Sequence, residues 1–209
     1  MRRSEIGRGV GEGRPGDLTR LLALALVLTI GVSGFVADGA GAGAPGGRLT
    51  SLAVSPQDGT LWVGTAQGLF RSGDRGRTLV PVTLPAKAGA VEVTAVVLEP
   101  RPPHVVYVAT GGEGIFRSED GGKSWTAASS GLAGLDVRGL AVSPTDGRLH
   151  AQVPAKGLFR SFDGAMTWQR VDNGPKGTMY TLASVNISTG MGGIFLYVAT
   201  DQGLVRGPD

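Results

Sequence analysis

The sequence predicts an all-β fold, a β-propeller of four-stranded antiparallel blades, and three observations lead to this prediction. A short apolar segment with Arg as its fourth residue occurs four times, at 68–72, 114–118, 157–161 and 203–207, with a period of about 43–46 residues. Two further strand-like segments precede each copy, and no helical pattern intervenes. Two of the turns contain Pro followed by Asp-Gly, which favours a tight turn. Such a period with four short strands is typical of propeller blades, although the strands alone would also fit a stacked β-solenoid.

The strands follow in chain order in each unit. The expected first strands are 49–55, 93–98, 137–143 and 180–187, and the second strands are 61–65, 105–110, 149–153 and 196–200. The four segments of the repeat are the third strands. Because the first strands are apolar throughout, each should be an inner strand packed on both faces. The domain is expected to span 43–209, with blades at about 48–84, 91–129, 135–172 and 178–209.

The last blade is expected to be incomplete. The fourth unit ends at Asp209, where its last turn is expected, so the sequence predicts three full blades and a three-stranded fourth. Two interpretations remain open, a small four-bladed ring with an open last blade or a piece of a larger propeller, and the interruption within a motif favours the second. An unfinished ring would expose an apolar face between blades, which favours association.

A polar motif follows the third strand in three units, with the pattern Ser-x-Asp-x-Gly-x-Ser/Thr-Trp. It resembles the Asp-box, or BNR repeat, of sialidase-like and sortilin-like β-propellers, and the repeats also resemble those of photosystem II assembly-factor propellers. In the first copy Leu79 replaces the tryptophan. The motif residues are Ser72, Asp74, Gly76 and Thr78 in the first copy, Ser118, Asp120, Gly122, Ser124 and Trp125 in the second, and Ser161, Asp163, Thr167 and Trp168 in the third.

The motif is expected to have a structural role. Its Asp should accept backbone N–H bonds and lock the turn between the third and fourth strands, and its Trp should cover the outer edge of the blade. The Arg that precedes each copy predicts either a ring of cations or local ion pairs, and the second is the simpler interpretation.

A ligand site is expected on the face away from these turns. In a four-stranded blade, the turns between first and second and between third and fourth strands lie on one face, here called the box face. The turns between second and third strands and the connections to the next blade lie on the other, here called the connection face. Ligands of propellers usually enter on the connection face. Its candidate residues are Glu113, Asp136, Arg138, Lys156, Asp172 and Asp201.

The resemblance to sialidases covers the repeat but not the catalytic site. The family's Arg-Ile-Pro motif is absent, and the chain has three tyrosines, two of them in expected second strands, where packing is the simpler interpretation. Xyloglucanases with tandem propellers also carry Asp-boxes and use a carboxylate pair across a cleft. Asp136 and Asp172 or Asp201 could face a channel, but a single short ring offers no such cleft, so we expect no catalytic residue. We also expect no metal site and no cofactor.

The first 42 residues are expected to be a signal peptide or an N-terminal membrane anchor, followed by a spacer. Five Arg precede the apolar run Leu21–Ile30, and Ala40 and Ala42 fit a cleavage site. An uncleaved anchor is the alternative, because 18–37 approaches the ~20 residues that span a bilayer. In either case the domain would lie outside the cytoplasm, as a secreted or periplasmic protein or anchored to the outer side of the plasma membrane.

Composition restricts the partners. The chain has no Cys, and residues 43–209 hold 15 of the 20 Lys and Arg and 13 of the 17 Asp and Glu. This near balance gives no basic face for nucleic acid. We expect an exported, non-catalytic scaffold for protein or glycan binding or assembly, and the alternative is a glycoside hydrolase-like fragment of sialidase or xyloglucanase type. Self-association through open blade edges is a further possibility, and membrane contact would involve only an uncleaved N-terminal segment.

Overall fold

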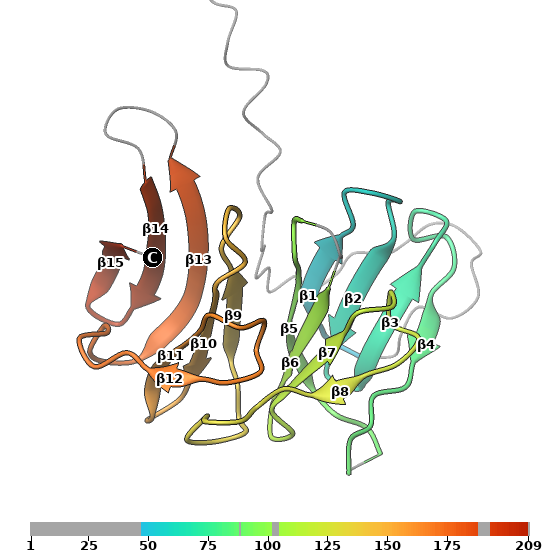
Figure 1. The fold of residues 1–209 in the computed structure, drawn as a ribbon. Coiled ribbons are helices and arrows are strands. Elements are labelled where there is room, and N and C mark those ends of the chain that lie inside the picture. The colour runs from blue at the N-terminus through green and yellow to red at the C-terminus, as the bar shows by residue number, and fades with distance from the viewer. Residues whose placement is uncertain (1–46, 88, 102–104, 188–192, 209) are drawn as a thin grey trace, which may run out of the picture.

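The predicted all-β propeller fold is confirmed (Figure 1). A computed structural model describes residues 47–87, 89–101, 105–187 and 193–208. In these ranges fifteen strands form four antiparallel sheets and there is no helix, so none is long and apolar enough to cross a membrane. The expected signal or anchor lies outside the described residues.

Each sheet contains strands that are consecutive in the chain, and each strand pairs with the next. Blade 1 contains β1 (Leu49–Val54), β2 (Leu61–Thr65), β3 (Gly68–Ser72) and β4 (Val80–Val82). Blade 2 contains β5 (Val93–Leu98), β6 (Val106–Thr110), β7 (Ile115–Ser118) and β8 (Thr126–Ala127). Blade 3 contains β9 (Gly139–Val142), β10 (Leu149–Val153), β11 (Gly157–Ser161) and β12 (Gln169–Arg170). Blade 4, which has three strands in the described part, contains β13 (Met179–Ile187), β14 (Gly193–Thr200) and β15 (Gly203–Pro208).

The blades are arranged in sequence through their inner strands. Strand β1 packs against β5, β5 against β9, and β9 against β13. Figure 1 shows the resulting succession, with blade 1 and blade 4 at opposite ends of the described domain.

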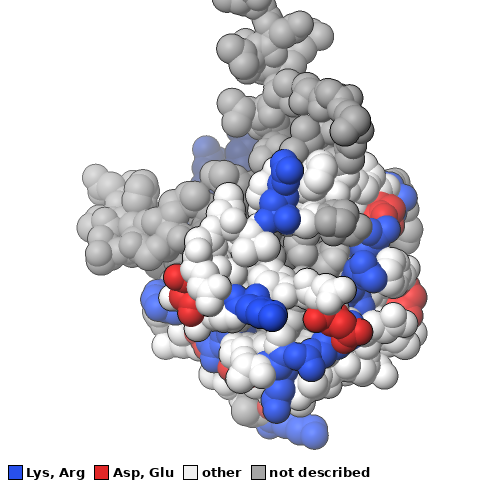
Figure 2. All heavy atoms as spheres, turned by 90° about the vertical axis from the view of Figure 1, so that its left-hand side faces the viewer, with Lys and Arg blue, Asp and Glu red and all other residues white. Residues whose placement is uncertain are grey.

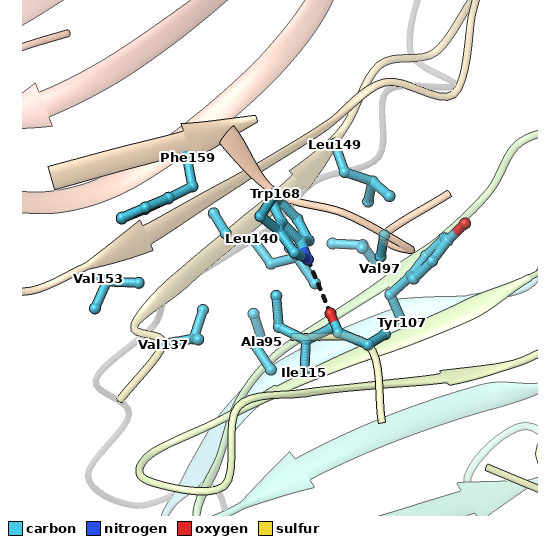
Figure 3. Close-up of a cluster of buried hydrophobic side chains, with 14 of the residues drawn as sticks. Ala95, Val97, Tyr107, Ile115, Val137, Leu140, Leu149, Val153, Phe159 and Trp168 are labelled. Carbon is cyan, nitrogen blue, oxygen red and sulfur yellow. Dashed lines mark hydrogen bonds between the residues drawn. The ribbon is translucent and has the colours of Figure 1, made fainter. Parts of the chain in front are cut away.

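The hydrophobic core lies between neighbouring blades. Figure 3 shows the cluster between blades 2 and 3, where Tyr107 and Ile115 meet Leu140, Phe159 and Trp168. A second cluster, which includes Trp62, Leu69 and Val96, fills the space between blades 1 and 2. A third cluster, which includes Leu158, Leu182 and Val198, joins blades 3 and 4. In β5 and β6 of blade 2, alternating side chains thus contribute to two different clusters, one on each face of the sheet.

The expectation that each first strand is packed on both faces is wrong for blades 1 and 4. In β13 of blade 4, Tyr180 is 64% exposed, and Thr181 and Ala183 are also exposed. Strand β5 is buried on both faces, as predicted, but Leu49, Leu52 and Val54 of β1 are 55%, 46% and 57% exposed. Among the described residues no blade covers this side of β1. The apolar composition of β1 therefore does not mean that both of its faces are packed.

Candidate functional site

The Asp-box of blade 2 is a closed set of hydrogen bonds within one turn. The Asp120 carboxylate accepts from the backbone N–H of Lys123 and of Ser124, both at 2.9 Å, and from the Ser124 hydroxyl at 2.6 Å. The Ser118 hydroxyl donates to Asp120 and accepts from the Gly122 N–H, both at 2.8 Å. Bonds from the Ser124 side chain and backbone lower the pKa of Asp120 well below its usual range, because they favour the charged form.

The boxes of blades 1 and 3 repeat this geometry. Asp74 accepts from the Thr78 N–H at 2.9 Å and from its hydroxyl at 2.6 Å, and Asp163 accepts from the same groups of Thr167 at 2.8 and 2.6 Å. Hydrogen bonds lower the pKa of both carboxyls, led by the hydroxyl of Ser72 for Asp74 and by that of Thr167 for Asp163. All three box carboxylates are thus engaged within their own turns.

The box tryptophans contact the preceding blade, which sequence reasoning missed. Trp168 of blade 3 is 3% exposed, and its indole Nε1–H donates to the backbone carbonyl of Ala128 in blade 2 at 2.8 Å (Figure 3). Trp125 of blade 2 meets Trp62 of blade 1 edge to face, with ring centroids 6.1 Å apart. Each indole therefore joins two blades as well as covering its own.

The repeated arginines make local contacts. Arg117 pairs with Glu119 at 2.5 Å, and Arg71 donates to the backbone carbonyl of Gly121 in the next blade at 3.3 Å. The other two stack on aromatic rings, Arg160 on Phe162 and Arg206 on Phe195, at 4.5 and 4.9 Å from the ring centroids. These contacts agree with the simpler interpretation of a strand-end Arg.

A charged cluster lies on the connection face, and it joins three blades. Arg138 donates from Nη1 to Glu92 Oε2 at 2.7 Å, and its Nε lies 2.6 Å from Asp136 Oδ1. Arg48 lies 3.9 Å from the other oxygen of Glu92. Arg48 and Glu92 directly precede β1 and β5, and Asp136 and Arg138 come just before β9, so the inner strands bring these four residues together.

The turn between the second and third strands of blade 2 supports this charged cluster. Gly111 donates its N–H to the Glu92 carbonyl at 2.9 Å and forms a β-bridge with Asp136. A Cβ at position 111 would come within 2.8 Å of the Glu92 carboxylate and 3.1 Å of the Arg138 guanidinium. A side chain at this position would therefore displace the Glu92 carboxylate and the Arg138 guanidinium.

The structure brings together only part of the predicted set. Asp136 and Arg138 are ion-paired, and Glu113 lies in the turn of blade 2 next to them. Lys156, Asp172 and Asp201 are exposed in separate turns of blades 3 and 4. Sequence reasoning missed Arg48 and Glu92, although both occupy the position just before a first strand, which could have indicated them.

The charged cluster is accessible, and Arg138 within it keeps its charge. Although burial acts to lower it, hydrogen bonds with Glu92 and Asp136 raise the pKa of Arg138. The side chains of Arg48, Asp136 and Arg138 are 76%, 47% and 42% exposed. In the described ranges no three His, Asp or Glu residues gather into a metal-binding group. This arrangement offers donors and acceptors to a polar ligand.

Figure 2 shows the side of the molecule that faces left in Figure 1. Basic and acidic side chains are scattered there among uncharged surface. On the box face, a shallow groove of about 400 Å³ lies between blades 1 and 2, lined by residues that include Asp58, Arg71, Glu119 and Lys123. It is partly closed by the bond between Arg71 and Gly121.

No protein-family model matches the chain. Over 79 residues it is 39% identical to a protein of Neosartorya fischeri named "Probable oligoxyloglucan-reducing end-specific xyloglucanase", a match that covers 35% of this chain and 10% of that protein. The chain thus spans about a tenth of the length of this relative.

Solved structures with a similar fold are β-propeller proteins. The extracellular domain of BT4673 from B. thetaiotaomicron has a TM-score of 0.60 at 16% identity, covering 78% of this chain and 21% of that one. The GH74 xyloglucanase of Xanthomonas campestris has a TM-score of 0.53 at 24% identity, covering 75% and 29%. YCF48 bound to D1 peptide has a TM-score of 0.52 at 16% identity, covering 77% and 49%. At these identities the likeness establishes the fold alone.

Proposed function

We propose that this chain is an exported, non-catalytic β-propeller scaffold of the Asp-box type, which binds a protein or a glycan on its connection face. The observation that supports this most is the charged cluster of Arg48, Glu92, Asp136 and Arg138. It presents both signs of charge at the inner strands of three blades, and three of its four side chains are well exposed. Such a surface suits a ligand with hydroxyl, amide or carboxylate groups.

The pairing within the charged cluster favours binding over catalysis. Glycoside hydrolysis uses two carboxyl groups that face each other across the bond to be cleaved, roughly 5–9.5 Å apart, with one of them protonated. Here Arg138 holds Asp136 at 2.6 Å and Glu92 at 2.7 Å, so both carboxylates are bound to the same guanidinium. They are therefore arranged as ion-pair partners.

The comparisons add support from other propellers. The YCF48 structure is bound to a peptide, and the BT4673 structure is an extracellular domain. Binding and an extracytoplasmic location are thus both compatible with this fold. Function lies in the site and not in the fold, so these likenesses support the proposal without deciding it.

A glycoside hydrolase-like function, of sialidase or xyloglucanase type, is the alternative. The 39% identity to the Neosartorya fischeri protein and the fold of the GH74 xyloglucanase favour it. In this case carboxylates such as Asp136, Asp172 or Asp201 would act with residues supplied by further blades.

One experiment separates the two functions. The full chain is incubated with xyloglucan oligosaccharides and with a chromogenic sialoside, and its binding to a panel of glycans and extended peptides is measured by calorimetry. We expect binding without turnover. Turnover that Asp136→Asn abolishes would overturn the non-catalytic proposal, and the absence of binding across the panel would count against a scaffold.

A matched pair of variants locates the binding face. Arg138→Ala should weaken binding at least about tenfold, because a charge-assisted bond contributes about 1.5–3 kcal/mol. Arg101→Ala removes an exposed Arg that also pairs with a glutamate, Glu99, but lies at the turn after β5 on the box face. It should leave binding unchanged, and equal losses in the two variants would place the ligand elsewhere.

A further inference from the structure

The first and last of the four described blades each have one apolar face that no other described residue covers, and the repeat shows what these faces normally contact. We call the face of a sheet on the side of the preceding blade its leading face, and the face on the side of the next blade its trailing face. Strand pairing identifies the equivalent positions, since Leu52 pairs with Val63 as Val96 pairs with Val108. The same position can therefore be compared in all four blades.

The leading face of blade 1 is open. Leu52 is 46% exposed, whereas its equivalents Val96, Leu140 and Leu182 are 2%, 2% and 3% exposed. Leu49 is 55% exposed, whereas its equivalents are at most 7% exposed; these are Val93, Val137 and Met179. In blades 2, 3 and 4 the preceding blade covers these positions. On blade 1 the same apolar surface has no cover among the described residues.

The trailing face of blade 4 is open in the same way. Leu204 is 70% exposed, whereas its equivalents Leu69, Ile115 and Leu158 are 1%, 0% and 4% exposed because the next blade covers them. Tyr197 is the equivalent of the buried residues Trp62, Tyr107 and His150, and it is only half-buried. Blade 4 therefore presents the surface that blades 1 to 3 use to hold a following blade.

A hydrogen bond with a fixed acceptor accompanies this contact. At the three interfaces, a side chain of one blade donates to the same backbone carbonyl of the next. These bonds are Thr50 Oγ1 to Val93, Thr94 Oγ1 to Val137 at 2.6 Å, and Gln152 Nε2 to Met179 at 3.1 Å. The equivalent carbonyl on blade 1 belongs to Leu49. The residue of blade 4 at the Thr50 and Thr94 position is Tyr180, which carries a hydroxyl and is 64% exposed.

We propose that two copies of this chain join head to tail, with the trailing face of blade 4 of one protomer on the leading face of blade 1 of its partner, and so close a ring of eight blades. The two faces belong to one chain and match the two sides of a contact that this chain already makes three times. Contacts of this heterologous kind close into rings when the rotation permits. Propellers typically have 4–8 blades, so two arcs of the four described blades reach about eight blades, and three such arcs would exceed the range.

A second copy is the occupant that the described residues favour. Both open faces have aliphatic residues at their centres, and the equivalent interfaces in the chain are built from aliphatic and aromatic side chains. Burying such surface is the main driving force of association. This inference concerns the assembly of the propeller and does not rest on the proposed function.

The test is the oligomeric state of the full chain, measured by sedimentation equilibrium from about 1 to 100 μM, a range that detects micromolar association. We expect a dimer of defined mass. A monomer at all concentrations would overturn the proposal, as would masses that grow without limit, which indicate an open chain of copies. The monomer would instead indicate that further blades of a longer polypeptide, or a different partner, cover the faces.

Single charges distinguish the faces. Leu52→Arg and Leu204→Arg each place a charge in one interface, and each should weaken dimerisation about 100-fold or more. Both positions are exposed in the single chain, so circular dichroism should show folded variants. Should Leu52→Arg fail to fold, Leu49→Lys tests the same face. Met166→Arg is the control, because Met166 is 61% exposed in the box turn of blade 3, away from both faces, and should still dimerise.

Mixing the two variants tests the head-to-tail geometry. A Leu52→Arg chain keeps its blade 4 face, and a Leu204→Arg chain keeps its blade 1 face, so one intact interface can form between them. We expect the mixture to form heterodimers that neither variant forms alone. A dimer that survives Leu52→Arg but is lost with Leu204→Arg would indicate a symmetric contact through blade 4 and would overturn the proposal.

Discussion

The indole of Trp168 should contribute more to stability than that of Trp125, because only one of the two has a hydrogen-bond partner. Trp168 Nε1–H donates at 2.8 Å to the carbonyl of Ala128, a residue that is 5% exposed. The indole N–H of Trp125 is buried and has no partner in the described part of the chain. Trp168→Phe and Trp125→Phe therefore remove a similar volume, but only Trp168→Phe removes a hydrogen bond.

The magnitudes follow from this difference. Trp168→Phe leaves a buried carbonyl unsatisfied, which costs about 1–3 kcal/mol. The loss of apolar area and the void left behind add about 1 kcal/mol. Trp125→Phe also loses area, but it removes a buried donor that had no acceptor, so its free energy of unfolding should change by less than about 1 kcal/mol. At about 2–4 °C per kcal/mol, Trp168→Phe should lower Tm by roughly 5–15 °C.

The assay is urea and thermal unfolding of the full chain, followed by far-ultraviolet circular dichroism because both variants change the tryptophan fluorescence. Trp168→Ala and Trp125→Ala provide the larger truncation, and Trp168→Ala should cost about 3–5 kcal/mol. Equal losses of stability in the two Phe variants would refute the reasoning, since the bond to Ala128 would then contribute nothing.

Two further predictions concern turns on the box face. Gly122→Ala should be much more destabilising than Gly121→Ala in thermal unfolding. Both residues have a positive φ, +83° at Gly122 and +70° at Gly121. A Cβ at position 122 would lie 2.3 Å from Trp62 Cη2, whereas a Cβ at position 121 would meet no atom within 4 Å. Overpacking of this kind costs about 1–3 kcal/mol beyond the backbone strain, and equal effects would contradict the contact with Trp62. Acid should also destabilise the fold, because the pKa of Asp120 is lowered in the folded state and the Ser55 hydroxyl helps to lower that of Asp58 to about 2. The stability that these carboxylates contribute is fully present above their unfolded pKa of 3.8 and is lost as the pH falls toward their lower folded pKa. The urea midpoint should therefore drop between pH 5 and pH 2. The drop should be smaller in Asp120→Asn, which lacks one of the titrating groups.

The sequence was sufficient for the strands and for the register of the repeat. Every third strand begins at or next to the glycine that starts the repeated segment, as in Gly68–Ser72 and Gly157–Ser161. Strand ends were less predictable. The first strand of blade 3 was expected from residue 137 but begins at Gly139, because Val137 bonds to Thr110 of the neighbouring blade and not within its own sheet.

Contacts between blades could not be derived from the strand pattern, which describes one sheet at a time. Thr94 and Val137 are 43 residues apart, and Arg138 and Glu92 are 46 apart, so these partners are separated by about one repeat. Trp168 reaches back 40 residues to Ala128 for the same reason. The useful signal would have been polar or aromatic side chains one period apart at the ends of inner strands.

The charged cluster arises where blade 3 departs from the repeat. Blades 1 and 2 use Thr50 and Thr94 to donate to the next blade, and Arg138 occupies this position in blade 3. In blade 3, the side chain that donates to the next blade is instead Gln152, which pairs with Gly139 on the adjacent strand. The equivalents of Gln152 in the other blades are small residues, Gly64, Ala109 and Ala199.

The use of Gln152 as the donor frees the position of Arg138 from its role in the contact between blades. Because Gln152 supplies the bond to blade 4, Arg138 does not have to, and its guanidinium turns to Glu92 and Asp136 instead. Positions that recur in every blade, such as the box carboxylates, maintain the architecture. A position where the repeat changes its residue, and where a second change keeps the interface intact, is a stronger candidate for function. On this reasoning Arg138, and not the more noticeable Asp120, is the first residue to vary in a search for the ligand.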